Sequence, residues 1–164
     1  MTYELRHGTV DDGEEILELW HGFTDHLSEY DERYRHKEDA DERWLRYFEN
    51  QLIDSKYGTV IVAEHEDSGE LIGVLEARIT GDHPIFRLKD HGYINGHYVE
   101  ESHWNEGIGK ALVEEAHDWF ASPPHEVEFY RIDVMEGDAK AAEVYEKLGF
   151  EPVEHAYERS IEEQ

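Results

Sequence analysis

The stretch that decides the fold runs Tyr98-Val99-Glu100-Glu101-Ser102-His103-Trp104-Asn105-Glu106-Gly107-Ile108-Gly109-Lys110-Ala111-Leu112. Its first residues suit a strand, its middle a loop with two glycines, and its end the first turn of a helix. Apolar or small residues then recur with a period near 3.6, which is typical of an amphipathic helix, at Ile108, Ala111, Leu112, Ala116, Trp119 and Phe120. Bare N–H groups at the start of such a helix can surround an anion, and glycine permits its close approach. The stretch therefore predicts a strand, an anion-binding loop and a helix in succession.

Strand and helix patterns follow one another along the rest of the chain. Thr9 and Asp12 fit a capping box before a first helix, and Pro123 and Pro124 end the third helix. Strands are expected at residues 3–7, 59–66, 71–80, 93–99, 127–134 and 152–160, and helices at 16–30, 44–52, 108–121 and 139–148. The order β-α-α-β-β-β-α-β-α-β predicts an α/β fold with a mixed, mostly antiparallel central sheet flanked by helices, in a single domain over residues 1–164.

Charge is the dominant feature of the composition. The 164 residues include 41 acidic and 15 basic side chains, which gives a net charge of −26. Acidity spread along the whole chain indicates a salt-adapted, halophilic protein, because concentrated salt screens the repulsion. The same charge argues against nucleic acid and anionic membranes as partners. The chain has no cysteine, no run of transmembrane length and no signal peptide, so we expect a cytoplasmic protein without a thiol nucleophile.

A second distinctive run is Asp138-Ala139-Lys140-Ala141-Ala142-Glu143-Val144-Tyr145-Glu146-Lys147-Leu148-Gly149-Phe150. Together with the glycine loop it resembles the GNAT superfamily of acyl-CoA-dependent N-acetyltransferases. The family's loop reads Gln or Arg, two residues, Gly, one residue, then Gly or Ala, and Gly107 and Gly109 match it. Trp104 departs from it at the Gln or Arg position, and Asp138 replaces the usual Asn of the second run.

The resemblance implies which residues meet the coenzyme. It predicts acetyl-CoA contacts from Tyr98, Val99, Trp104, Asn105, Glu106, Gly107, Ile108, Gly109, Lys110, Asp138, Ala141 and Tyr145. Backbone amides of the loop would bind the pyrophosphate, and the departure at Trp104 implies weaker or salt-dependent binding. Tyr145 would protonate the leaving thiolate, a role that suits a phenol of pKa about 10. A backbone N–H near Val99, on a splayed strand, would stabilise the oxyanion.

The base that deprotonates the amine is less well defined. Alternation places Tyr93, Asn95, His97 and Val99 on one face of their strand, and none is a carboxylate. His97 has a suitable intrinsic pKa, and Asn95 could orient a water molecule. Glu76 and Glu136 are the alternatives. His21, His26, Tyr34 and His36 are candidates for lining the acceptor pocket, and the spacing of the three histidines matches no metal motif, so no metal is expected.

The sequence as a whole favours an enzyme. We expect an acetyltransferase that moves the acetyl group of acetyl-CoA to a primary amine by direct attack in a ternary complex, since no cysteine offers a covalent route. The alternative is a non-catalytic acyl-CoA-binding module on the same fold, and Trp104, Asn105, Asp138 and the missing strand carboxylate keep it open. The acceptor amine is not identified, and a homodimer is possible because dimers are frequent among relatives.

Overall fold

A five-stranded sheet organises the computed structural model, which describes residues 2–81 and 83–162. Its strands are β1 (Tyr3–His7), β2 (Gly58–His65), β3 (Leu71–Thr80), β4 (His91–Val99) and β5 (Tyr130–Ile132), in that order across the sheet. The first four pair antiparallel, and β4 and β5 pair parallel. The helices are α1 (Gly13–Ser28), α2 (Asp41–Tyr47), α3 (Ile108–Ala121) and α4 (Ala139–Lys147), and a π-helical segment, η3 (Phe48–Ile53), continues α2. The predicted mixed α/β fold is thus confirmed.

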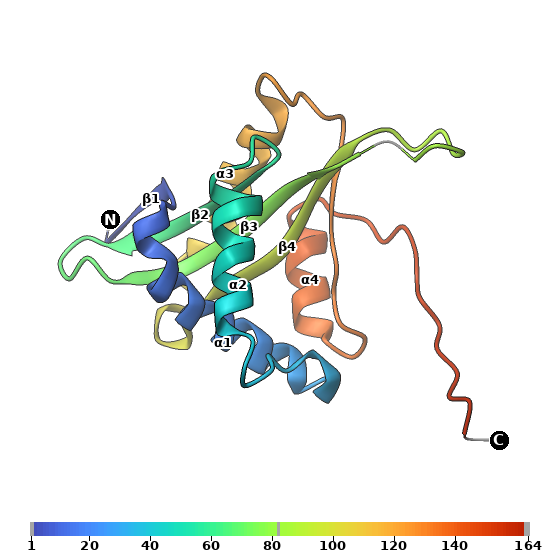
Figure 1. The fold of residues 1–164 in the computed structure, drawn as a ribbon, viewed down its shortest axis with the longest axis horizontal. Coiled ribbons are helices and arrows are strands. Elements are labelled where there is room, and N and C mark those ends of the chain that lie inside the picture. The colour runs from blue at the N-terminus through green and yellow to red at the C-terminus, as the bar shows by residue number, and fades with distance from the viewer. Residues whose placement is uncertain (1, 82, 163–164) are drawn as a thin grey trace.

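Helices cover both faces of the sheet (Figure 1). Alternate residues of β2 show why: Val60 and Val62 pack with α1, α2 and η3, whereas Ile61 and Ala63 pack with α3. Strand β2 is buried on both sides, which suits its run of β-branched residues. The capping box predicted ahead of α1 is present, with Asp12 accepting the backbone N–H of Thr9 at 2.8 Å.

The last predicted strand, at residues 152–160, is wrong. No strand forms after α4 in the described residues, and this part of the chain runs away from the sheet (Figure 1). Its apolar side chains stay in solvent, with Tyr157 95% exposed. Two surface ion pairs, Arg131–Glu154 and Arg33–Glu158, connect it to the rest of the protein. Such pairs contribute about 0–1 kcal/mol each, less than the 1–2 kcal/mol that ordering one backbone residue costs. Strand β5 is likewise shorter than the predicted 127–134.

None of the helices in the described residues is both long enough and apolar enough to span a membrane.

Gly92 allows α3 to lie directly on the β4–β5 pair. A Cβ at this position would overlap the ring of Phe120, which is fully buried in α3. We expect Gly92→Ala to lower the free energy of unfolding by about 1–3 kcal/mol, the usual cost of overpacking. Gly81→Ala is the control, because a Cβ there meets no atom within 4 Å, and it should stay within about 0.5 kcal/mol. Urea unfolding of both variants checks this, and equal midpoints would contradict the contact.

Candidate active site

Strands β4 and β5 separate halfway along β4. They pair only where Gly92, Tyr93 and Ile94 lie opposite Tyr130, Arg131 and Ile132. Beyond Ile94, β4 continues to Val99, and in the described part of the chain it pairs there with β3 alone. The backbone groups on the far side of this half-strand therefore have no strand partner, and apart from the carbonyl of Val99, which accepts from Trp104, they are available to a ligand. The splayed strand implied by the family resemblance is present at this point.

A β-bulge at Asn95 changes which residues share a face. Glu76 of β3 pairs with Gly96 and Ala77 with Ile94, so Asn95 is the extra, unpaired residue. Before the bulge, Ile94 packs with α3; after it, Gly96 faces Trp20 and Phe23 of α1. The prediction that Tyr93, Asn95, His97 and Val99 share one face is therefore wrong, because the bulge reverses the alternation. His97 and Val99 lie on the α3 face, and Asn95 is exposed at the bulge.

The glycine loop does open a helix, as predicted. Gly107 is the N-cap of α3, with a left-handed φ of 82°, and helix α3 begins at Ile108. The N–H groups of the first helical turn have no acceptor within the helix. A Cβ at Gly107 would meet no atom within 4 Å, so the space beside this turn is open. The geometry suits an anion held by backbone amides at a helix N-terminus. Ile108 itself is buried, so only its backbone can take part.

Trp104 links this loop to its neighbours. Its indole Nε1 donates to the carbonyl of Val99 at 2.7 Å, and the ring remains 43% exposed. The ammonium of Lys140, at the start of α4, lies 5.0 Å from the ring centroid, within cation–π range. Glu106 instead reaches back to His103 at 3.3 Å. Trp104 thus connects the end of β4, the loop and α4, and it brings a lysine to the site of the missing arginine or glutamine.

Tyr145 lies at the end of a hydrogen-bond chain that starts in the loop. Its hydroxyl is 2.8 Å from Nδ1 of His97, and Nε2 of His97 is 3.0 Å from the carbonyl oxygen of Gly109. Burial raises the pKa of Tyr145 above its ordinary value, and the charge of Asp138 adds to the rise. Burial also lowers the pKa of His97 to about 4, against a smaller opposite effect of the Gly109 hydrogen bond. The phenol therefore stays protonated and the imidazole neutral near pH 7.

Glu76 is a buried carboxylate beside the bulge. It is 4% exposed, accepts a short hydrogen bond from the hydroxyl of Tyr47, and lines a small pocket with Gly96 and His97. Burial raises the pKa of Glu76 to about 7, although the Tyr47 hydroxyl and Arg78 oppose the rise. A carboxylate with a pKa near 7 suits a general base. The sequence named Glu76 only as an alternative, and no sequence signal pointed to Tyr47, which is 29 residues away on another element.

Two residues predicted at the coenzyme have their side chains engaged elsewhere. Both carboxylate oxygens of Asp138 are occupied: one accepts the N–H of Ala141 as a cap of α4, and the other lies 3.0 Å from Nε2 of His26. The ring of Tyr98 packs on the α1 face, against Gly22. Direct coenzyme contacts of these residues stay predictions, as do those of Asn105, Glu106, Lys110 and Ala141. Glu136 is exposed on the loop before α4.

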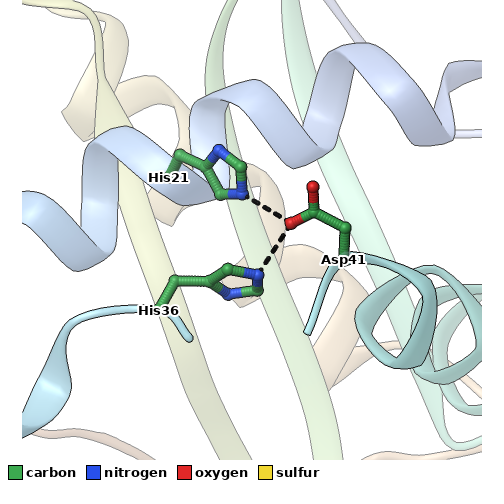
Figure 2. Close-up of side chains that lie close together, drawn as sticks. All are labelled: His21, His36 and Asp41. Atoms are coloured by element: carbon green, nitrogen blue, oxygen red, sulfur yellow. Dashed lines mark hydrogen bonds and ion pairs between the residues drawn. The ribbon is translucent and has the colours of Figure 1, made fainter. Parts of the chain in front are cut away.

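Two of the side chains considered for the acceptor side, His21 and His36, lie around the carboxylate of Asp41 (Figure 2). Oδ1 of Asp41 lies 3.0 Å from Nε2 of His21 and 2.9 Å from Nε2 of His36. The hydrogen bond from His21 is the main reason that the pKa of Asp41 falls below its usual value. The three ligand atoms lie within 4.8 Å of one another, close enough to be considered for a metal ion.

The hydrogen bond at Nδ1 of His36 argues against a metal ion at Nε2. Nε1 of Trp20 donates to Nδ1 of His36 at 3.2 Å, and an indole can only donate, so the proton of neutral His36 sits on Nε2. A metal-bound imidazole keeps its proton on the other nitrogen and donates it to an acceptor. The arrangement therefore suits a hydrogen-bonded clasp that joins α1, the loop before α2 and the first residue of α2. The absence of a metal in the protein stays a prediction.

Known structures share this fold. The chain is similar to the BH1408 protein of Bacillus halodurans, a tetramutant of which is 20% identical with a TM-score of 0.79, covering 96% of this chain and 99% of that one. The aminoglycoside 6'-N-acetyltransferase AAC(6')-IG of Acinetobacter haemolyticus is 18% identical, with a TM-score of 0.71 and coverage of 98% and 99%. AAC(6')-Iy, bound to a bisubstrate analogue of CoA and acetylneamine, is 17% identical, with a TM-score of 0.72 and 98% coverage of both chains.

A sequence profile identifies the family. No curated protein matches the sequence. The sequence profile described as "Acetyltransferase (GNAT) family" matches residues 20–150, which include the bulged strand β4, the glycine loop and the tyrosine helix α4. On this match and on the fold, the chain belongs to the acetyltransferase (GNAT) family.

Proposed function

We propose that this protein is an N-acetyltransferase that moves the acetyl group of acetyl-CoA to a primary amine by direct attack in a ternary complex. One observation carries the proposal. The open first turn of α3 and the hydroxyl of Tyr145 are joined through a single side chain, His97. A coenzyme whose pyrophosphate is held by that turn would lie close to the phenol of Tyr145.

The bond changes assign a role to each group. The amine nitrogen attacks the thioester carbonyl carbon, and the C–S bond then breaks. The hydroxyl of Tyr145 turns from His97 to the sulfur and gives its proton to the thiolate, and Glu76 takes the proton that the attacking nitrogen loses. Glu76 faces the α1 side of the sheet opposite Gly96, whereas Tyr145 bonds to His97 on the α3 side. Base and acid thus approach from opposite faces at the bulge, which supports amine entry from the α1 side.

The acceptor side favours a cationic amine. Asp133 accepts a hydrogen bond of 2.6 Å from Tyr93, close to the point where β4 and β5 separate, and Glu76 lies deeper. Two of the similar proteins described above are aminoglycoside N-acetyltransferases, and aminoglycosides are amines with several positive charges. We propose a soluble amine with more than one positive charge as acceptor, and a requirement for concentrated salt because of the net charge of −26.

Calorimetry of acetyl-CoA binding tests the coenzyme site. It is done in about 1 M KCl, where charges are screened within about 3 Å. We expect micromolar binding by the wild type and none by Gly107→Trp, whose ring would fill the space beside the first turn of α3. Gly69→Trp is the matched control, because Gly69 also has a positive φ, 75°, and open space around its Cβ, but lies in the β2–β3 turn.

Turnover then separates the two functions considered for this fold. Thiol release is followed with polyamines, aminoglycosides, amino acids and lysine peptides. Transfer to a polycationic amine supports the proposal. Binding without transfer to any amine supports the non-catalytic module instead. Absence of binding by a folded wild type would overturn both.

A further inference from the structure

The ring of His97 lies where three elements meet. It projects from β4, and it bonds to the carbonyl of Gly109 in the first turn of α3 and to the hydroxyl of Tyr145 in α4. Both ring nitrogens are engaged, at 3.0 and 2.8 Å. A Cβ on Gly109 would lie 3.5 Å from Nε2 of His97, so the imidazole packs directly against the turn.

The direction of each hydrogen bond follows from the partners. A backbone carbonyl can only accept, so Nε2 of His97 carries the proton and donates to Gly109. Burial keeps the pKa of His97 near 4, so the ring is neutral at pH 7 and Nδ1 has a free lone pair. The hydroxyl of Tyr145 must therefore donate to Nδ1. The carbonyl of Gly109 thus selects the tautomer of His97, and that tautomer holds the hydroxyl of Tyr145 at Nδ1 until the hydroxyl turns to the thiolate.

We propose that His97 is a positioning residue that ties the hydroxyl of Tyr145 to the first turn of α3. The role rests on the proposed function, in which that turn holds the coenzyme. The first turn of α3 then holds both the coenzyme and, through His97, the phenol oxygen of Tyr145. The distance between the phenol and the coenzyme sulfur is therefore set by this turn and does not depend on how α4 packs. A displacement of about 1 Å between reacting groups can cost about 100-fold in rate.

This role differs from the base that the sequence favoured. A base must offer a free lone pair to the amine, and the one lone pair of the neutral His97 ring already accepts from Tyr145. His97 also lies on the α3 side of the sheet, whereas Glu76 faces the α1 side. His97 therefore acts through Tyr145 and does not touch the amine.

Two substitutions of His97 by an amide side chain test its two hydrogen bonds separately. In His97→Asn, Oδ1 takes the place of Nδ1 and can still accept from Tyr145, while the donor to Gly109 is lost. In His97→Gln, Nε2 can still donate to Gly109, while the acceptor for Tyr145 is lost. We expect His97→Gln to lower kcat about 10- to 100-fold with an unchanged KM for acetyl-CoA, and His97→Asn to recover most of that loss.

A double-mutant cycle shows whether His97 works through Tyr145. On a Tyr145→Phe background the hydroxyl is already gone, so His97→Gln should lower kcat no further. Losses that multiply would overturn the proposal, because they would give His97 a role independent of Tyr145. Equal losses in the Asn and Gln variants would overturn it too. Absence of turnover in the wild type would instead refute the proposed function itself, and the positioning role with it.

Nitrogen NMR of the imidazoles tests the geometry without turnover. We expect His97 to remain the Nε2–H tautomer, without titrating between about pH 5 and 8, unlike an ordinary histidine of pKa about 6.5. Tyr145→Phe should shift the Nδ1 resonance of His97 and leave the clasp histidine His21 unchanged. A His97 that titrates near its ordinary pKa, or an Nδ1 that ignores Tyr145→Phe, would show that the pair does not form.

Discussion

Glu76→Gln is expected to remove most of the activity and, at the same time, to stabilise the fold above neutral pH. An amide cannot accept the proton of the attacking amine, and a lost general base typically costs about 100- to 10,000-fold in kcat. In the wild type, kcat/KM should rise through about pH 7 as Glu76 ionises, because burial raises its pKa to about 7. The variant should lack that rise.

The stability effect follows from the same pKa. The unfolded chain releases the Glu76 proton near 4.5, and the folded chain holds it until about pH 7. Between these values the unfolded state binds fewer protons, so the free energy of unfolding falls as pH rises, and the full cost is present above pH 7. This pKa difference corresponds to a loss of at most about 3 kcal/mol in the free energy of unfolding. The variant avoids this loss because Gln is uncharged.

Urea unfolding at pH 4 and pH 8, together with initial rates, checks both parts. Glu70→Gln is the control, because it removes one carboxylate from an exposed turn far from the site. We expect Glu76→Gln to be more stable than wild type at pH 8 and nearly equal at pH 4, and Glu70→Gln to follow the wild type at both. A variant with normal kcat would move the base elsewhere, for instance to a water held by Asn95.

The sequence was a good guide where one segment determines its own structure. The capping box at Thr9, the glycine N-cap of α3 and the hairpin of β2 and β3 all depend on residues a few positions apart, and all formed as expected. The glycine loop belongs to this group, because its turn and its helix stripe lie in one continuous stretch.

Features that depend on two segments were not predictable. The bulge at Asn95 results from the pairing of β4 with β3, and no alternation within β4 can reveal it. It placed His97 on the α3 face, next to Tyr145, away from the face on which Glu76 of β3 lies. The missing strand at 152–160 has the same origin: its alternating pattern suits a strand, but a strand also needs a partner, and β5 is only three residues long.

Tyr145→Phe is expected to separate chemistry from coenzyme binding. The phenol is the only group in the proposed mechanism that gives a proton to the thiolate, so we expect kcat to fall about 100- to 1,000-fold. The acetyl-CoA affinity should change little, because the turn of α3 that receives the pyrophosphate keeps all its N–H groups. Burial raises the pKa of Tyr145, so the loss should be similar across the neutral pH range.

Tyr157→Phe is the matched control for this variant, because Tyr157 is 95% exposed beyond α4 and touches no part of the site. Calorimetry and single-turnover rates with both variants give the comparison. Normal turnover by Tyr145→Phe would mean that solvent protonates the thiolate, and the hydrogen bond to His97 would then serve only to hold α4 against β4. A loss of coenzyme binding equal to the loss of kcat would point to a misplaced α4. Only a fall in kcat with preserved binding assigns the proton to Tyr145, since the phenylalanine ring fills the same space and lacks nothing except the hydroxyl.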